Sequence, residues 1–306
     1  TCSHPLNSNH ENISAAVELQ EGESLILELQ WLPSIEERKP EHHPTIGDLE
    51  TRLKQTRAFW KTWINGCKYT GPYEEPIKRS ALALKAMTYA PSGAVVAAPT
   101  TSLPEQIGGE RNWDYRYTWI RDSTLTLISL MILGFKAEAD AFRHWLRRTS
   151  AGRPQDLQIM YGIDGRRSLP EQELGHLAGH RSSRPVRIGN GAVKQLQLDA
   201  YGSLLQAVYL YAKLGGEVSP SNWEYLAGLA DIVTGRWELP DQGIWEIRDK
   251  PRHFIHSKLL CWVALDRAVK IAELHGFEGP LDRWSLHRDN IRNYLMEDAT
   301  RKGWFS

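Results

Sequence analysis

The sequence predicts a mainly α-helical protein with a short β region ahead of the helices. Three observations predict this class. From residue 76 onward apolar residues recur at spacings of three and four, glycines interrupt that pattern at 134, 215, 216 and 276, and the segments between them come in pairs of similar length. A chain of 306 residues with 41% hydrophobic and 24% charged residues can also bury a full core.

The N-terminal part carries the β signal. Residues 15–31 hold two short alternating runs around Glu21-Gly22-Glu23, a pattern typical of the end of a β-structure. Pro40 and Pro44 then break the pattern, and a polar helix with aromatic residues is expected at 46–64 as a connector. We expect further helices at 76–89, 118–133, 136–150, 193–214, 221–237, 257–275 and 280–297.

Long connections separate these helices. They span residues 91–112, 152–191 and 239–254 and are rich in Gly, Pro, Arg and aromatic residues. Loops of this length are uncommon in a compact domain and usually carry function, so they are expected to line a site that the helices support. The alternative is that they are surface insertions.

Composition limits the classes of partner. The 37 basic residues balance 37 acidic ones, which favours neither nucleic acid nor an anionic membrane, so a neutral partner fits best. The 12 Trp and 11 Tyr suit a sugar-binding cleft, and they suit ordinary helix packing equally well. Three widely separated cysteines indicate neither a disulfide framework nor a zinc ribbon, and a reducing compartment, the cytoplasm, is expected.

The first dense motif runs from Gly108 to Asp122. Aromatic residues at 113, 115, 117 and 119 alternate with polar ones, so an extended conformation would give one aromatic and one polar face. Residues 125–133 are apolar nearly all round, as in a buried helix, and Arg121 and Asp122 fall in its first turn. Asp122 is either a functional carboxylate or simply an anion stabilised by the helix dipole.

The second dense motif is D-Q-G-I-W-E-I-R-D at 241–249. A Glu246 pressed against Trp245 would lose solvation, which raises the pKa of a carboxylic acid and suits a general acid at neutral pH. The alternative is a structural ion pair between Glu246 and Arg248.

Several motifs together resemble glycoside hydrolase family 15, which holds glucoamylases and bacterial trehalases of the glucoamylase type. They are R-N-W-D-Y-R-Y-T-W-I-R-D (111–122), L-Q-I-M-Y-G-I-D-G (157–165), P-V-R-I-G-N-G-A (185–192), G-I-W-E-I-R (243–248) and R-H-F-I-H-S-K (252–258). The resemblance implies an (α/α)6 barrel, incomplete here, after the tail of a β-sandwich. The expected division is therefore 1–34 for the sandwich, 35–75 for a helical linker and 76–306 for the truncated barrel.

The same resemblance implies inverting hydrolysis of terminal α-glucosidic bonds and assigns roles to residues. Glu246 matches the general acid, Trp119, Arg121 and Asp122 match residues that hold the non-reducing glucose, and Trp245 matches the tryptophan beside the acid. Further cleft residues are expected at Trp113, Glu171, Arg187, Asn190, Arg248 and His256.

An inverting glycosidase also needs a carboxylate base roughly 6.5–9.5 Å from the acid. The family's base lies beyond residue 306, so the chain is expected to be a fragment that is inactive by itself. Nothing in the spacing of Glu171, Glu173 or Glu238 supports any of them as a replacement.

Other readings remain open at this point. A glucoside phosphorylase on the same barrel would need a phosphate site, and a glucoside-binding protein would bind without turnover. The pairs His253/His256 and His176/His180 have spacings that can place two imidazoles on one helix face, but two ligands do not make a metal site. We expect no cofactor, although phosphate and magnesium dependence in some trehalases of the family leaves an ion requirement open. The oligomeric state is not predicted.

Overall fold

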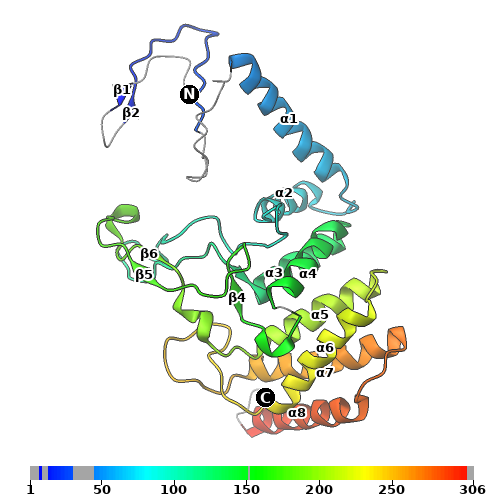
Figure 1. The fold of residues 1–306 in the computed structure, drawn as a ribbon. Coiled ribbons are helices and arrows are strands. Elements are labelled where there is room, and N and C mark those ends of the chain that lie inside the picture. The colour runs from blue at the N-terminus through cyan, green and yellow to red at the C-terminus, as the bar shows by residue number, and fades with distance from the viewer. Residues whose placement is uncertain (1–6, 9–12, 30–44, 151, 302–306) are drawn as a thin grey trace. The chain divides into compact units, whose positions relative to one another are not determined.

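The computed structural model describes residues 7–8, 13–29, 45–150 and 152–301 (Figure 1). Contacts divide the chain into two compact units, Thr1–Gly66 and Cys67–Ser306, which are treated separately below. The predicted division at 34 and 75 and the assignment of residues 1–34 to a β-sandwich stay predictions.

In the first unit, β1 (Asn7–Ser8) pairs antiparallel with β2 (Ile13–Ser14). The predicted strands at 15–31 are wrong over the part that the structure describes, because residues 15–29 contain a turn and one bridge residue but no strand. Two short strands without a further sheet to pack on are only marginally stable, so alternation alone does not specify a strand.

Helix α1 (Ile46–Asn65) confirms the helix expected at 46–64. Thr45 caps it, since its hydroxyl accepts from the Asp48 N–H at 3.2 Å while the Asp48 carboxylate accepts from the Thr45 N–H at 2.8 Å. No residue of α1 is buried, which agrees with the polar pattern of the segment.

The second unit contains the remaining helices, and the mainly helical class is confirmed. They are α2 (Glu74–Ala86), α3 (Ile120–Ile132), α4 (Lys136–Thr149), α5 (Asp199–Lys213), α6 (Pro220–Arg236), α7 (Ile255–His275) and α8 (Leu281–Arg301). Each predicted helix is present. Helix α5 begins six residues later than expected, because Gly191–Lys194 form a separate 3-10 turn.

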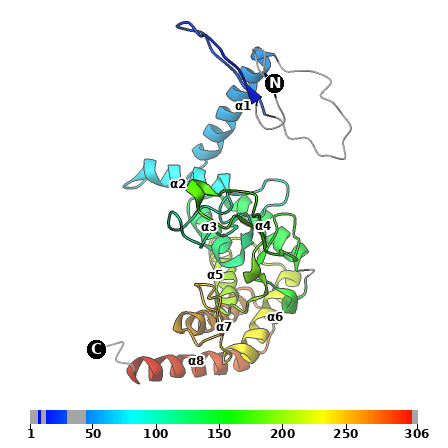
Figure 2. The same cartoon turned by 90° about the vertical axis from the view of Figure 1, so that its left-hand side faces the viewer.

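Helix α3 packs on α5, α5 packs on α7, and α7 packs on α8, and these helices follow one another along a stack (Figure 2). Tryptophans fill much of the core between them. Trp145 and Trp284 are almost fully buried, and the ring of Trp223 meets that of Trp284 edge-on at 5.8 Å. The high Trp content therefore serves helix packing to a large extent.

Gly202 allows α5 to approach α7 closely. A Cβ atom at this position would lie 2.1 Å from the carbonyl oxygen of Leu260 in α7. We expect Gly202→Ala to lower the free energy of unfolding by about 3 kcal/mol, because backbone cannot move aside as a side chain can. Urea denaturation of the native protein measures this change.

The matched control is Gly235→Ala in α6, where a Cβ would meet nothing within 4 Å. Because alanine forms helix more readily than glycine, this variant should gain about 0.5 kcal/mol. Equal effects at the two positions would contradict the packing explanation.

The long predicted connections are confirmed, and they gather on one side of the helices (Figure 1). Two short antiparallel pairs order them, β3 (Thr118–Trp119) with β4 (Met160–Tyr161) and β5 (Gln172–Glu173) with β6 (Arg187–Ile188). A second buried cluster that includes Trp119, Met160 and Val193 lies among these loops. The loops therefore have a core of their own, which fixes the side chains that they carry.

Two further features concern the whole described chain. Cys67 and Cys261 are free cysteines, and Cys2 lies outside the described residues. Among the helices that the structure describes, none is long and apolar enough to span a membrane.

Candidate active site

Glu246 lies in the loop 241–252, called here the acid loop. Reciprocal backbone bonds of 2.9 and 2.8 Å between Asp241 and Arg252 close its base, and the Gln195 amide donates to the carbonyls of Glu246 and Ile247. Glu246 itself has a φ of +52°, in the left-handed region that few residues other than glycine adopt. Such backbone strain is typical of functional positions, where the surrounding contacts hold it.

The Glu246 carboxyl faces Trp119 and Arg121. The indole N–H of Trp119 donates to Oε1 at 2.5 Å, and Nη2 of Arg121 lies 3.9 Å from the same oxygen. Burial raises the pKa of Glu246 above its ordinary value, and the bonds from Gln197 and Trp119 and the charge of Arg121 oppose this only in part. The site thus favours a neutral carboxylic acid that is able to donate a proton.

The burial of Glu246 does not come from Trp245, as the sequence suggested. Trp245 is 80% exposed, whereas Trp119 is 3% exposed and bonds directly to the carboxyl. The Glu246 carboxyl meets Trp119 and not its chain neighbour, which the sequence pattern does not reveal. A role for Trp245 in substrate binding stays a prediction.

Arg121 and Asp122 lie in the first turn of α3, as predicted. Nη2 of Arg121 is 3.3 Å from Asp122 Oδ2, while Nη1 is 3.2 Å from Gln197 Oε1 and 3.4 Å from Asp199 Oδ2. The Asp122 side chain is 46% exposed and the Arg121 side chain 14%. The pair therefore offers solvent-accessible acceptor and donor groups beside Glu246.

Sequence reasoning missed Gln197 and Asp199, which are both buried against Arg121. Their signal is the alternation of polar residues at 195, 197 and 199, which ends on the first residue of α5. The helix predicted over 193–214 hides this period of two. His256, in the first turn of α7, has its Nδ1 3.9 Å from Asp199, so the N-termini of α3, α5 and α7 meet here.

The predicted extended stretch before α3 pairs with residues 97–102. The Ala98 N–H donates to the Tyr115 carbonyl at 3.0 Å, and that of Ser102 donates to the Trp113 carbonyl at 2.9 Å. Tyr115 and Trp119 contact each other with ring centroids 5.9 Å apart. The rings of residues 115 and 119 therefore share one face, as expected.

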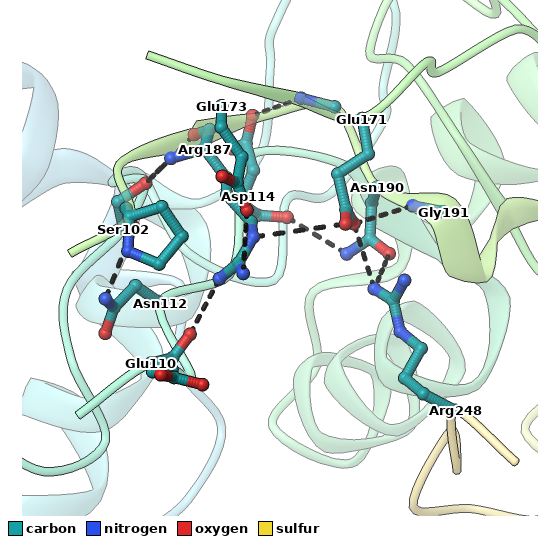
Figure 3. A network of polar contacts seen from close by, with 12 residues as sticks. Ser102, Glu110, Asn112, Asp114, Glu171, Glu173, Arg187, Asn190, Gly191 and Arg248 are labelled. Atoms are coloured by element: carbon teal, nitrogen blue, oxygen red, sulfur yellow. Dashed lines mark hydrogen bonds and ion pairs between the residues drawn. The ribbon is translucent and has the colours of Figure 1, made fainter. Parts of the chain in front are cut away.

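A second group of predicted residues forms a network of arginines and carboxylates (Figure 3). Glu171 accepts from Arg248 at 3.0 Å and from the Gly191 N–H at 2.9 Å, and Arg248 also reaches the Asn190 side chain at 3.3 Å. Arg187 lies 4.0 Å from Glu171. Arg187 and Arg248 also lie over the ring of Trp113, at 4.7 and 4.6 Å from its centroid.

Arg248 bonds to Glu171, so the alternative of a structural ion pair between Arg248 and Glu246 is wrong. Burial raises the pKa of Glu171, but the bonds from Gly191 and Arg248 outweigh it and leave the pKa lowered. Glu173 pairs with Arg187 at 3.2 Å, and Glu238 is exposed.

The histidine pairs do not share a helix. His253 precedes α7, which contains His256, and His176 lies in a turn ahead of the 3-10 helix that begins at His180. In the part of the chain that the structure describes, no group of three or more His, Cys, Asp or Glu residues is placed to hold a metal ion.

The structure thus brings Glu246, Trp119, Arg121, Asp122 and His256 to one place and groups the other predicted residues, apart from Trp245, in the network around Trp113. Arg248 connects the two groups, since it follows Glu246 by two positions. A carboxylic acid with a raised pKa can protonate a leaving group, and the neighbouring Arg-Asp pair can hold the hydroxyl groups of a ligand.

Comparison with known proteins adds independent information. A model of the family described as "Glycosyl hydrolases family 15" matches residues 71–305. The chain is 44% identical over 297 residues to the trehalase of Mycolicibacterium smegmatis, covering 94% of this chain and 43% of that protein. It is 43% identical over 289 residues to the trehalase of Mycobacterium tuberculosis, covering 92% and 41%.

The chain therefore spans about two fifths of the length of these curated relatives. A solved structure described as "Glycosidase Wild Type" superposes with a TM-score of 0.54 at 19% identity, over 75% of this chain and 59% of the other. That likeness concerns the fold.

Proposed function

Because the chain belongs to glycosyl hydrolase family 15, we propose that it carries the general acid and the glucose-holding residues of an inverting hydrolase of trehalose. The observation that supports this best is the half-buried Glu246 carboxyl with its raised pKa, bonded to Trp119 beside Arg121 and Asp122. The choice of trehalose rests on the relatives named trehalases, which are 44% and 43% identical to this chain.

In the proposed reaction Glu246 donates its proton to the oxygen that joins the two glucose units. The C1–O bond breaks, one glucose leaves, and water attacks C1 from the opposite face while a carboxylate accepts the proton of that water. Inversion at one centre of α,α-trehalose yields one β-glucose and one α-glucose. The proton on Glu246 is thus replaced overall by the proton taken from water.

Arg121 and Asp122 are proposed to bind hydroxyl groups of the glucose whose bond breaks. Charged donors and acceptors form the stronger hydrogen bonds, and the pair is already ordered by Gln197 and Asp199. Trp119 is 3% exposed and its indole N–H donates to Glu246, so we propose that it holds the acid in place rather than offering a free apolar face to the sugar.

The base is not assigned to a described residue. Glu171 is held by Arg248 and Gly191, and Glu173 and Glu238 are exposed, so none has the surroundings expected of a base across the sugar. We propose that residues 1–306 alone do not turn trehalose over. We further propose that the reaction of the native protein needs no cofactor. The rate of glucose release should then be unchanged by a chelator and by added phosphate or magnesium.

The test is glucose release from trehalose and maltotriose by the native full-length protein and by a polypeptide of residues 1–306. We expect turnover by the native protein, faster on trehalose, and none by the shorter chain. Proton NMR of the first products should show α- and β-glucose in equal amounts. Two α-glucose molecules would overturn the proposed inverting mechanism. Faster cleavage of maltotriose would overturn the choice of trehalose as the substrate. Activity of residues 1–306 alone would place the base among them.

A further inference from the structure

Asp199 is a buried carboxylate that the proposed reaction does not use. It is the first residue of α5 and is 0% exposed. Its Oδ2 lies 3.4 Å from Nη1 of Arg121 and 3.9 Å from Nδ1 of His256, while Oδ1 is buried without a hydrogen-bond partner. Burial of a carboxylate is costly unless a cation compensates it, and Arg121 supplies that cation. What the carboxylate does for Arg121 in return is the question here.

Asp199 and Gln197 together determine how Arg121 is turned. Both lie against Nη1 of the guanidinium, at 3.4 and 3.2 Å. The other terminal nitrogen, Nη2, is thereby directed to Asp122 at 3.3 Å and Glu246 at 3.9 Å. Because a guanidinium is planar and rigid, fixing one edge fixes the other.

Asp199 also changes the charge balance next to Glu246. A single guanidinium next to a carboxyl group would favour the ionised form of that group and remove the proton that a general acid must keep. Two further carboxylates, Asp122 and Asp199, share the charge of Arg121. The charged and titratable groups around the cluster are Tyr115, Arg121, Asp122, Asp241, Glu246, His256, Lys258 and Cys261.

We propose that Asp199 is a positioning residue that fixes the orientation of the Arg121 guanidinium and balances its charge beside Glu246. The inference rests on the proposed function, in which Glu246 donates a proton. Asp199 shares the charge of the Arg121 guanidinium, which lies 3.9 Å from Glu246 and opposes the raised pKa of that carboxyl.

The experiment compares the pH dependence of kcat on trehalose for the native full-length protein and its Asp199→Asn variant. Asparagine has the same shape but no charge, so Arg121 acts more strongly on Glu246. The alkaline limb of the profile, where the acid loses its proton, should move down by about one pH unit. An unchanged limb would overturn the proposal, even if kcat fell.

Two further variants complete the design. Asp266→Asn is the matched control, since Asp266 is 4% exposed and pairs with Arg267 and Lys270 in α7, and it should leave the limb in place. Gln197→Glu adds a carboxylate beside Arg121 and removes the amide that hydrogen-bonds to Glu246, and both changes should move the limb up. If Asp199→Asn does not fold, the Gln197→Glu variant decides. An alkaline limb that stays in place or moves down in this variant overturns the proposal that carboxylates balance the charge of Arg121.

The proposed function is examined first and separately. If the native protein releases no glucose from either substrate, or if Glu246→Gln retains full activity, the proposed function fails and the inference fails with it. If the native protein is active and Glu246→Gln is not, the position of the alkaline limb in the Asp199 variant decides the inference alone.

Discussion

The Glu246→Gln protein is expected to hydrolyse trehalose about 10²–10⁴ times more slowly than the native protein, because glutamine has the shape of the acid but no proton to give. Its KM should change little, since Arg121 and Asp122 keep their contacts. On α-glucosyl fluoride the loss should be much smaller, because fluoride leaves without full protonation. Steady-state kinetics on both substrates measure the difference.

The native protein should also keep its activity above the pH at which an ordinary glutamate ionises. Burial raises the pKa of Glu246, so the active, protonated form persists to higher pH and is lost as pH rises through that raised pKa.

The control for Glu246→Gln is Glu224→Gln, at an exposed position in α6, which should retain native rates. Equal losses on trehalose and on the fluoride would remove Glu246 from the role of proton donor.

Arg121→Met is expected to lower the free energy of unfolding by about 3–5 kcal/mol, because it leaves Asp199 with a buried and uncompensated charge. The Arg121 side chain is 14% exposed and Asp199 is 0% exposed, so water cannot replace the lost cation. Chemical denaturation of the native full-length protein measures the effect. Adding Asp199→Asn to Arg121→Met should recover part of the loss, since the second change removes the uncompensated charge.

A surface pair provides the contrast. Arg283 and Asp231 form an ion pair whose side chains are 50% and 47% exposed, and Arg283→Met should cost no more than about 1 kcal/mol. Similar losses for the two arginines would mean that burial of Asp199 is not the cause. Failure of the double variant to recover stability would lead to the same conclusion.

Most of the fold was predictable from periodicity. The helices from α2 to α8 follow the apolar spacing of the sequence, and some carry terminal signals, such as Ser219 with Pro220 at the start of α6 and Gly276 in the left-handed conformation after α7. The expectation that 125–133 is buried all round is wrong, because Leu125 and Ile132 in α3 are exposed. The β region at 15–29 was not predictable in the same way. A strand depends on a partner, and alternation within a segment does not identify one.

The candidate site was predictable in part. The resemblance of the motifs at 111–122 and 243–248 to family 15 pointed to Glu246 and the Arg121-Asp122 pair, whereas the local pattern alone left a structural role open for Asp122 and Glu246. The alternation at 195, 197 and 199 sets Gln197 and Asp199 apart as polar positions, but their contact with Arg121 and the true neighbour of Glu246 depend on tertiary structure. Trp119 and Glu246 are separated by 127 positions, and only the fold brings them together.

The meeting of the N-termini of α3, α5 and α7 has a consequence for the order of folding. Arg121 and Asp199 are 78 positions apart, and each lies at the end of a different helix. A helix can form within its own segment. This cluster instead requires three helices to dock and the two long segments that connect them to form closed loops. The acid loop, closed at its base by Asp241 and Arg252, belongs to the same late assembly through Gln195. During refolding, helical content should therefore return before the environment of Trp119 does.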